Sequence, residues 1–193
     1  MIKKLMVAAV LLAPTAQAAP NHLEAPKTPV RAVSEPHKAS QGATQPTPEQ
    51  YFVPWENWLK KQGSPISGRD VWEAQQETGI QGEVLICITG AETNYGKVAQ
   101  RGSKTNVGSV GSYDATNTTH SAGSIKDGLV MIGRTLNNKL LGHKTTIAQL
   151  SRASEPYGAV YAESTYNWRV NLLSCLKKIK GVPVNDQYTF RTQ

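Results

Sequence analysis

A series of helical segments, each closed by a glycine, constrains the fold of this chain more strongly than any other sequence feature. From Tyr51 onward, apolar residues recur at helical spacing, and Gly63, Gly79, Gly142 and Gly181 each follow such a stretch. Glycine commonly ends helices because it adopts the left-handed backbone conformation at no steric cost. The pattern therefore predicts a mainly α fold.

The ends of the expected helices carry further signals. Ser67 with Asp70, and Ser124 with Asp127, have the spacing of a capping box, and Gly96 is the expected C-cap of the third helix. The six expected helices are a short one that carries Trp55, Trp58 and Leu59 and ends near Gly63, one from Ser67 to Gly79, and four at residues 83–95, 124–141, 145–153 and 165–180.

Residues 97–122 form the longest stretch of the helical region without a clear period. This segment is rich in Gly, Ser, Thr and Asn, and it leaves room for short strands. A loop of this length inside a compact domain is usually either functional or disordered. We therefore expect a large polar loop directly after the third helix.

The N-terminus has the pattern of a secretory signal peptide over residues 1–18. Lys3 and Lys4 precede an apolar run from Leu5 to Ala13, and Ala16-Gln17-Ala18 supplies a small-x-small cleavage site. A retained membrane anchor is the alternative, but the apolar run is too short to span a bilayer. The chain is therefore expected to be exported, to the periplasm or outside the cell, with no transmembrane segment after removal of the signal.

Three further regions are expected after the leader. Residues 19–49 are rich in Pro, Ala, Ser, Thr and Gln, and they have too few large apolar residues to fold. They are predicted to form a disordered linker. Residues 50–182 are predicted to form one domain, and residues 183–193 a C-terminal tail.

The charge balance favours an anionic partner. The chain has a formal net charge of +7, which falls to about +5 once Lys3 and Lys4 leave with the signal peptide. The basic residues are mostly scattered, and no zinc pattern or aromatic RNA-binding signature accompanies them. In an exported protein, anionic cell wall is a better candidate than nucleic acid. The alternative is that the charge merely keeps the domain soluble.

Cys87 and Cys175 are the two cysteines of the chain. Export to an oxidising compartment favours a disulfide between them, and two buried free thiols are the alternative. Closing a loop of this length stabilises a fold by roughly 3 to 5 kcal/mol in the loop-entropy model. No CxxC motif or His/Cys cluster is present, so neither a metal site nor a cofactor is expected.

Glu92 is the residue with the strongest chemical signal. Leu85 and Ile88 lie seven and four residues before it, which places Glu92 on the same apolar face of the expected helix. Burial and the negative end of the helix dipole both raise the pKa of a carboxyl group. A carboxylic acid that is still protonated near neutral pH can protonate the leaving oxygen of a glycoside. The alternative is a glutamate that pairs with a core arginine or caps a loop amide.

Several segments together resemble the lysozyme-like superfamily, in which a catalytic glutamate ends a buried helix. The segment from Ile88 to Gly96 resembles that of lytic transglycosylases and cell-wall glucosaminidases. Asn106 to Gly111 is similar to their Asn/Gly-rich stretch, and Tyr157 to Ala162 with Tyr166-Asn167-Trp168 to their tyrosine-bearing turn and last helix. The resemblance covers residues 70–180.

The resemblance implies a lysozyme-like helical domain that cleaves the β-1,4 bond between the amino sugars of peptidoglycan. The long loop would then lie beside the active-site groove. In a lytic transglycosylase, Glu92 would act first as acid and then as base, and the sugar's own 6-hydroxyl would give an anhydro end. Two departures leave a hydrolase open: Thr93 stands where Ser is common, and the Gly-Leu-Met-Gln type motif is absent.

A hydrolase of this fold, a muramidase or glucosaminidase, usually needs a second carboxylate. The candidates for it are Asp114, Asp127, Glu155 and Glu163, none of which stands at a diagnostic spacing. The absence of such a spacing favours a single catalytic glutamate.

Six residues are candidates for substrate binding, each with a structural alternative. The loop positions could present backbone groups to a sugar or simply form a flexible loop, and the tyrosines could contact the sugar, Glu92 or only the core. The candidates are Asn106, Gly108, Ser109, Tyr95, Tyr157 and Tyr161. The four tryptophans are expected in the core.

Peptidoglycan strands are the expected partner, and secretion, conjugation and other envelope machines are further candidates. A non-catalytic wall-binding or assembly protein is the main rival function, although an acid at Glu92 argues against it. A helical periplasmic interaction module is the second rival. A nucleic-acid binder is the third, and export argues against it.

Overall fold

The computed structural model describes residues 47–98, 103–111, 120–151, 160–162 and 165–192. The predicted signal peptide and most of the predicted linker lie outside the described residues. The last two positions of that linker, Pro48 and Glu49, begin the first helix. Proline is well accommodated in the first helical turn, because the N–H it lacks has no partner there.

The fold is mainly helical, as the sequence predicts. Within the described residues, two isolated antiparallel bridges join Ile80 to Arg191 and Thr146 to Thr189. No described helix is long and apolar enough to cross a membrane. The helices are α1 (Pro48–Lys61), α2 (Gly68–Thr78), α3 (Gly82–Thr93), α4 (Ile125–Leu136), α5 (Ile147–Leu150) and α6 (Thr165–Lys180).

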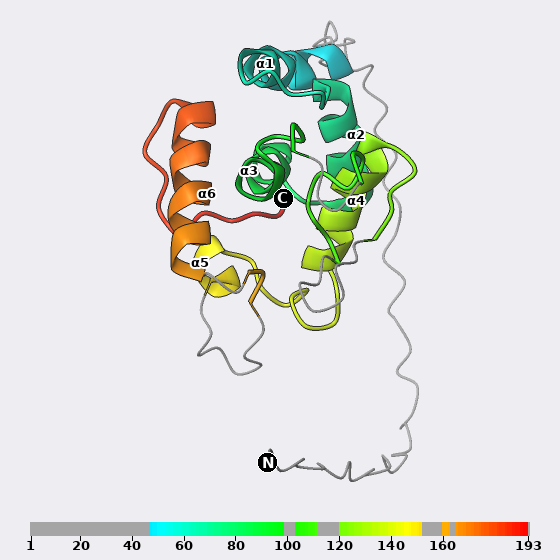
Figure 1. Cartoon of the computed structure of the whole chain (residues 1–193). Coiled ribbons are helices and arrows are strands. Elements are labelled where there is room, and N and C mark those ends of the chain that lie inside the picture. Colours follow the sequence, from blue (N-terminus) through cyan, green and yellow to red (C-terminus); the bar gives the residue numbers. More distant parts are fainter. Residues whose placement is uncertain (1–46, 99–102, 112–119, 152–159, 163–164, 193) are drawn as a thin grey trace, which may run out of the picture. The chain divides into compact units, whose positions relative to one another are not determined.

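Helix α3 forms the centre of the domain. It lies between α6 on one side and α2 and α4 on the other (Figure 1). Every residue from Val84 to Thr89 is buried. A helix that is apolar on all sides must be covered on all sides, so the composition of this segment dictates its central position.

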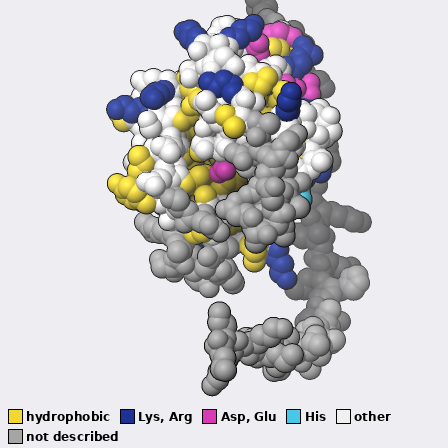
Figure 2. Space-filling model, in the orientation of Figure 1, with side chains coloured by type: hydrophobic (Ala, Val, Ile, Leu, Met, Phe, Trp, Pro, Cys, Tyr) yellow, Lys and Arg dark blue, Asp and Glu magenta, His cyan; other side chains and the backbone are white. Residues whose placement is uncertain are grey.

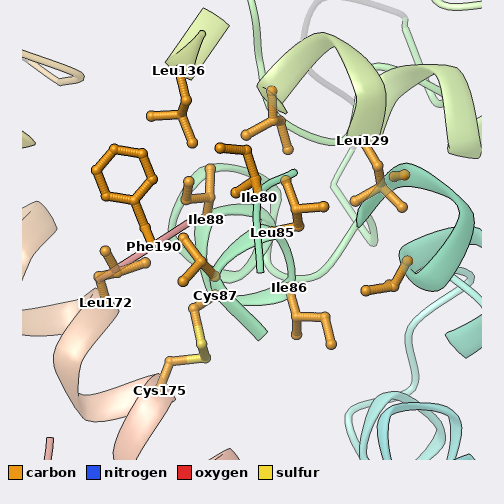
Figure 3. Packing of buried hydrophobic residues seen from close by; sticks show 14 of the residues in the cluster. Ile80, Leu85, Ile86, Cys87, Ile88, Leu129, Leu136, Leu172, Cys175 and Phe190 are labelled. Carbon is orange, nitrogen blue, oxygen red and sulfur yellow. A yellow bond between two sulfur atoms is a disulfide. The ribbon is translucent and has the colours of Figure 1, made fainter. Parts of the chain in front are cut away.

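The hydrophobic core forms around α3 and is joined covalently to α6 (Figure 3). Cys87 of α3 and Cys175 of α6 form the disulfide, with their Cα atoms 5.6 Å apart. Leu172 of α6 and Leu136 of α4 are both fully buried in this core. Helices α4 and α6 therefore contribute, from opposite sides of α3, to one continuous apolar cluster.

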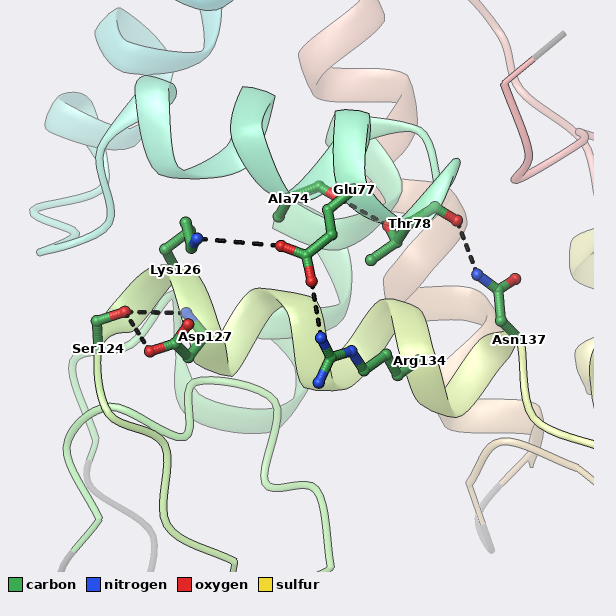
Figure 4. Close-up of polar contacts among 8 residues, drawn as sticks. All are labelled: Ala74, Glu77, Thr78, Ser124, Lys126, Asp127, Arg134 and Asn137. Carbon is green, nitrogen blue, oxygen red and sulfur yellow. Dashed lines mark hydrogen bonds and ion pairs between the residues drawn. The ribbon is translucent and has the colours of Figure 1, made fainter.

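Helices α2 and α4 approach each other closely because a glycine lies between them. A Cβ atom on Gly133 would fall 2.5 Å from the side chain of Thr78. Across the same interface, Glu77 pairs with Arg134 at 2.9 Å and with Lys126 at 3.9 Å (Figure 4). Asn137 Nδ2 donates to the carbonyl oxygen of Thr78 at 2.7 Å. These contacts hold α4 against α2 beside the long loop.

The local end signals of α2 and α6 are confirmed. Ser67 and Asp70 form the predicted capping box, and Gly79 ends α2 in the left-handed conformation. Helix α6 has the predicted bounds, and Gly181 follows it with φ +67°. At the start of α4 one half of the predicted capping box is present, because the Ser124 hydroxyl accepts from the Asp127 N–H, and the Asp127 carboxylate accepts from the Ser124 hydroxyl.

Three helix ends differ from the prediction. Helix α3 ends at Thr93, with Asn94 instead of Gly96 as its left-handed C-cap. Helix α4 ends at Leu136 rather than near residue 141, because the Asn138 side chain accepts from the N–H groups of Leu140 and Leu141 and turns the chain. Helix α5 has only four residues.

The C-terminal segment packs into the domain, whereas the sequence predicted a tail over residues 183–193. Phe190 is 0% exposed within the core. The Arg191 guanidinium donates to the carbonyl oxygens of Leu136, Gly142 and Lys144. Single apolar residues such as Phe190 carry no periodic signal, so only the tertiary contacts identify this segment as part of the fold.

Truncation of Phe190 tests this correction. We expect Phe190→Ala to lower the free energy of unfolding by about 3 to 5 kcal/mol, because it empties a fully buried site. Val182, which is 51% exposed, provides the control, and Val182→Ala should change stability by less than about 0.5 kcal/mol. Urea unfolding measures both values. Equal small effects would contradict the packing of Phe190.

The disulfide also has a measurable contribution. Its cysteines are 88 residues apart, so the loop-entropy model predicts a loss of roughly 3 to 5 kcal/mol in the Cys87→Ala, Cys175→Ala double variant. Urea unfolding under oxidising conditions measures this loss. The unmodified protein in excess reductant should approach the stability of the double variant. A loss below about 1 kcal/mol would contradict the prediction.

Candidate active site

Glu92 lies in the last turn of α3, where the helix leaves the core. Leu85 and Ile88 on its face are 0% exposed, whereas Glu92 itself is partly buried. The middle of α3 is buried on all sides. The spacing of its apolar residues alone therefore does not distinguish a solvent-exposed face from a buried one. What makes Glu92 unusual is its position at the boundary between core and solvent.

The electrostatics of Glu92 agree with that position. Burial raises the pKa of the Glu92 carboxyl above its ordinary value of 4.5. Burial also raises the pKa of the Tyr161 hydroxyl, and the negative charge of Glu92 raises it further. The two groups are therefore close enough for their charges to interact, as the sequence analysis suggested for Tyr161.

Tyr161 is held by the last two helices. Its N–H donates to the carbonyl oxygen of Leu150 at the end of α5, at 3.1 Å. Its ring stacks on Trp168 of α6, with centroids 5.2 Å apart and an interplanar angle of 29°. Two elements distant from α3 in the sequence thus fix the tyrosine near Glu92.

Thr93 joins the end of α3 to the long loop, a role that the sequence analysis missed. Its hydroxyl lies 2.7 Å from the carbonyl oxygen of Val107 and 3.1 Å from that of Thr89, and it accepts from the Gly96 N–H at 2.9 Å. Thr93 is only 2% exposed. A hydroxyl residue directly after an acid at a helix end is the signal that could have indicated this link.

The Asn106 side chain is buried under the loop and forms hydrogen bonds with the loop's backbone. It is 0% exposed. Its Nδ2 donates to the carbonyl oxygens of Val110 and His120 at 2.8 and 2.9 Å, and its Oδ1 accepts from the Val110 N–H at 3.0 Å. The Asn106 side chain thus supports the backbone of the loop, and a sugar contact by the loop's backbone groups stays a prediction.

The two other candidate loop residues have different surroundings. Gly108 is buried, and a Cβ atom there would lie 2.2 Å from Ile132, so glycine allows the loop to lie on α4. Ser109 has a left-handed backbone with φ +49°. Its hydroxyl oxygen is buried and has no hydrogen-bond partner among the described residues. Ser109 is therefore the loop residue with an unused polar group.

Tyr95 lies on a different side of α3 from Glu92. Its ring occupies the space that a Cβ on Gly90 would fill, and it meets the Trp58 ring edge-on at 5.0 Å. Its hydroxyl lies 3.9 Å from Cys175 Sγ. These contacts favour the core-packing alternative that the sequence analysis kept open for Tyr95.

Of the four candidates for a second carboxylate, only Asp127 lies within the described residues. Asp127 belongs to the start of α4, where its carboxylate accepts from the Ser124 hydroxyl at 2.8 Å. Asp114, Glu155 and Glu163 lie outside the described residues, as does the candidate Tyr157. No group of three or more His, Cys, Asp or Glu residues in the described part of the chain is placed to hold a metal ion.

The surface view is consistent with a partly enclosed acid. Figure 2 shows one face of the molecule, on which an acidic side chain lies in a hollow bordered by hydrophobic atoms. A carboxyl group in such surroundings exchanges water for apolar contacts, which disfavours its charged form.

Comparisons of this chain with protein-family models, with curated proteins and with solved structures find no match.

The raised pKa of Glu92 makes stability depend on pH. Between the ordinary value of 4.5 and the higher pKa of the folded state, the folded protein binds more protons than the unfolded chain. The free energy of unfolding therefore falls as pH rises through this window. Because Glu92→Gln removes that loss, we expect the variant to gain stability relative to the unmodified protein as pH rises.

Urea unfolding of both proteins at pH 4 and at pH 8 measures this difference. Glu49→Gln provides the contrast, because hydrogen bonds in the first turn of α1 hold the pKa of the Glu49 carboxyl below its ordinary value. That variant should instead lose stability relative to the unmodified protein as pH rises. A stability difference between Glu92→Gln and the unmodified protein that stays constant over this range would contradict the raised pKa.

Proposed function

We propose that this protein cleaves the glycan strands of bacterial cell wall at the β-1,4 bond between amino sugars, with Glu92 as the catalytic acid. The observation that carries the proposal is a carboxyl group with a raised pKa at the boundary of the core, close to Tyr161. The lysozyme-like pattern from Ile88 to Gly96 supports the same assignment.

The proposed chemistry begins with proton transfer from Glu92 to the glycosidic oxygen. Positive charge then develops on the sugar, and the bond to the leaving oxygen breaks. In a lytic transglycosylase the Glu92 carboxylate next removes the proton of the sugar's own 6-hydroxyl, which closes an anhydro ring. A raised pKa suits both steps, because the group must give up and regain a proton near neutral pH.

Tyr161 supports this cycle through its position. A neutral phenol near Glu92 can hydrogen-bond the carboxylate after the first proton transfer, or lie against the developing positive charge of the sugar. Because its pKa is raised, the hydroxyl keeps its proton and adds no negative charge beside Glu92. Its stacking on Trp168 fixes the ring for either role.

The loop at residues 103–111 is the proposed wall of the substrate site. Thr93 ties it to the turn that carries Glu92, so the acid and the loop keep a fixed relation. Ser109 is the residue of this loop best suited to a sugar, because its buried hydroxyl has no partner among the described residues.

Two alternatives use the same site. A hydrolase of the same fold would add a second carboxylate and release a reducing end, and three of its four candidate residues lie outside the described part of the chain. A non-catalytic wall-binding or assembly protein would keep the loop without the reaction. The raised pKa of Glu92 favours the catalytic readings, since wall binding does not need a protonated acid.

The proposed setting is the cell envelope. Residues 1–18 have a signal-peptide pattern, and the net charge of the chain is +7, which suits an anionic polymer. The proposed partner is peptidoglycan, with a secretion, conjugation or other envelope machine as the further candidates.

Mass spectrometry of peptidoglycan digested with the chain from residue 19 onward tests the proposal. We expect anhydro-ended products from the unmodified protein and at least about a 100-fold lower yield from Glu92→Gln, because general acid–base catalysis contributes that much or more. Glu49→Gln should retain full activity.

Each other outcome has a definite meaning. Reducing ends in place of anhydro ends would identify a hydrolase. Equal activity of Glu92→Gln would remove Glu92 from the mechanism. An absence of products from the folded, unmodified protein would contradict cleavage and leave the wall-binding alternative.

A further inference from the structure

A groove between α3 and α6 forms a second surface of chemical interest. It has a volume of about 260 Å³, and the Cys87–Cys175 disulfide lies along it. This volume lies somewhat below the range of about 300 to 1,000 Å³ for common small-molecule sites. The groove thus fits a group of one or two amino acids in size.

The groove lies on a different stripe of α3 from Glu92. Its residues on α3 and at the C-cap of α3 recur at steps of three and four, and they are Cys87, Gly90, Ala91 and Asn94. One residue advances a helix by about 100°, so Glu92 does not lie on that stripe. On α6, the lining residues Asn171, Ser174 and Lys178 recur in the same way. Two facing helical stripes therefore make the walls.

The walls are held in place by covalent and packing constraints. The disulfide fixes the separation of α3 and α6 with its two Cα atoms 5.6 Å apart. Tyr95 lines the groove as well, and it packs against α3 only because Gly90 has no side chain. The backbone of both walls is therefore fixed before a ligand binds, whereas the polar side chains of Asn94, Asn171, Ser174 and Lys178 are exposed and must be ordered on binding.

The charge and the polar groups of the groove indicate which chemical groups a ligand would need. No lining residue is acidic, and Lys178 supplies a positive charge. Lys178 forms no ion pair within the described part of the chain, in contrast to Lys180, which pairs with Glu83 at 3.1 Å. Asn94 and Asn171 offer amide groups that both donate and accept.

We infer that this groove binds a carboxylate that stands next to an amide, the chemistry of the free end of a short peptide. In this complex the Lys178 ammonium forms an ion pair with the carboxylate. The side chains of Asn94, Asn171 and Ser174 form hydrogen bonds with the neighbouring amide. The inference goes beyond the proposed cleavage of glycan and does not depend on it, because the ligand contains no glycosidic bond.

Calorimetric and NMR titration with N-acetyl-alanyl-alanine, which ends in a free carboxylate, tests the inference on the chain from residue 19 onward. We expect saturable binding in the millimolar range, with amide shifts at Asn94, Asn171, Ser174 and Lys178. The same peptide with an amidated C-terminus should bind at least about fivefold more weakly, because it lacks the charge that Lys178 pairs with.

Neighbouring lysines provide a matched pair of variants. Lys178→Gln should weaken binding of the acid by at least about fivefold, whereas Lys177→Gln, which removes the same charge from an exposed position outside the groove, should leave it unchanged. Ser174→Leu should abolish binding of both peptides by filling the groove. Ser174 is exposed on α6, so thermal unfolding of this variant should match that of the unmodified protein.

Three results would overturn the inference. They are equal affinity for the acid and the amide, equal effects of Lys177→Gln and Lys178→Gln, and no saturable binding of the acid. None of them bears on Glu92, because the probe is not a glycan. A failure of the groove and a failure of the proposed cleavage are therefore distinguished.

Discussion

Burial of α3 on every side is the constraint on which the rest of the structure depends. Its apolar residues from Val84 to Ile88 leave no face for water, so α2, α4 and α6 must surround it. The disulfide from Cys87 and the buried ring of Phe190 complete this cover from distant parts of the chain. The C-terminal segment is held for the same reason, since the Phe190 ring is fully buried in the same core.

Chemistry concentrates where this burial stops. At its C-terminal end α3 passes from core to surface within one turn. Glu92 and Thr93 point in different directions there because one residue advances the helix by about 100°, and Asn94 leaves the helix as its left-handed C-cap. Glu92 lies near Tyr161, Thr93 holds the loop through Val107, and Asn94 borders the groove beside α6. One helix end thus supplies an acid, a loop anchor and a wall of a second groove.

The sequence predicted helices better than it predicted where they end. Glycine and capping residues marked α2 and α6 well, because those signals act through backbone bonds within a few residues. The predicted end of α4 was wrong. The Asn138 side chain turns the chain there, although apolar residues continue at helical spacing beyond that point. In the site, Glu92 was identifiable by its residue type and position. The buried role of Asn106 and the link through Thr93 depend on partners that lie elsewhere in the chain.

The sequence by itself determined the mainly α class, the central apolar helix and the acid at its end, because these follow from local propensity and from the need to bury apolar surface. The tertiary structure decided the surroundings of each polar group. It alone places Tyr161 near Glu92, Tyr95 against Gly90 and Phe190 in the core. The physical reason is that burial and electrostatic interaction depend on distances between residues far apart in sequence, which no local pattern encodes.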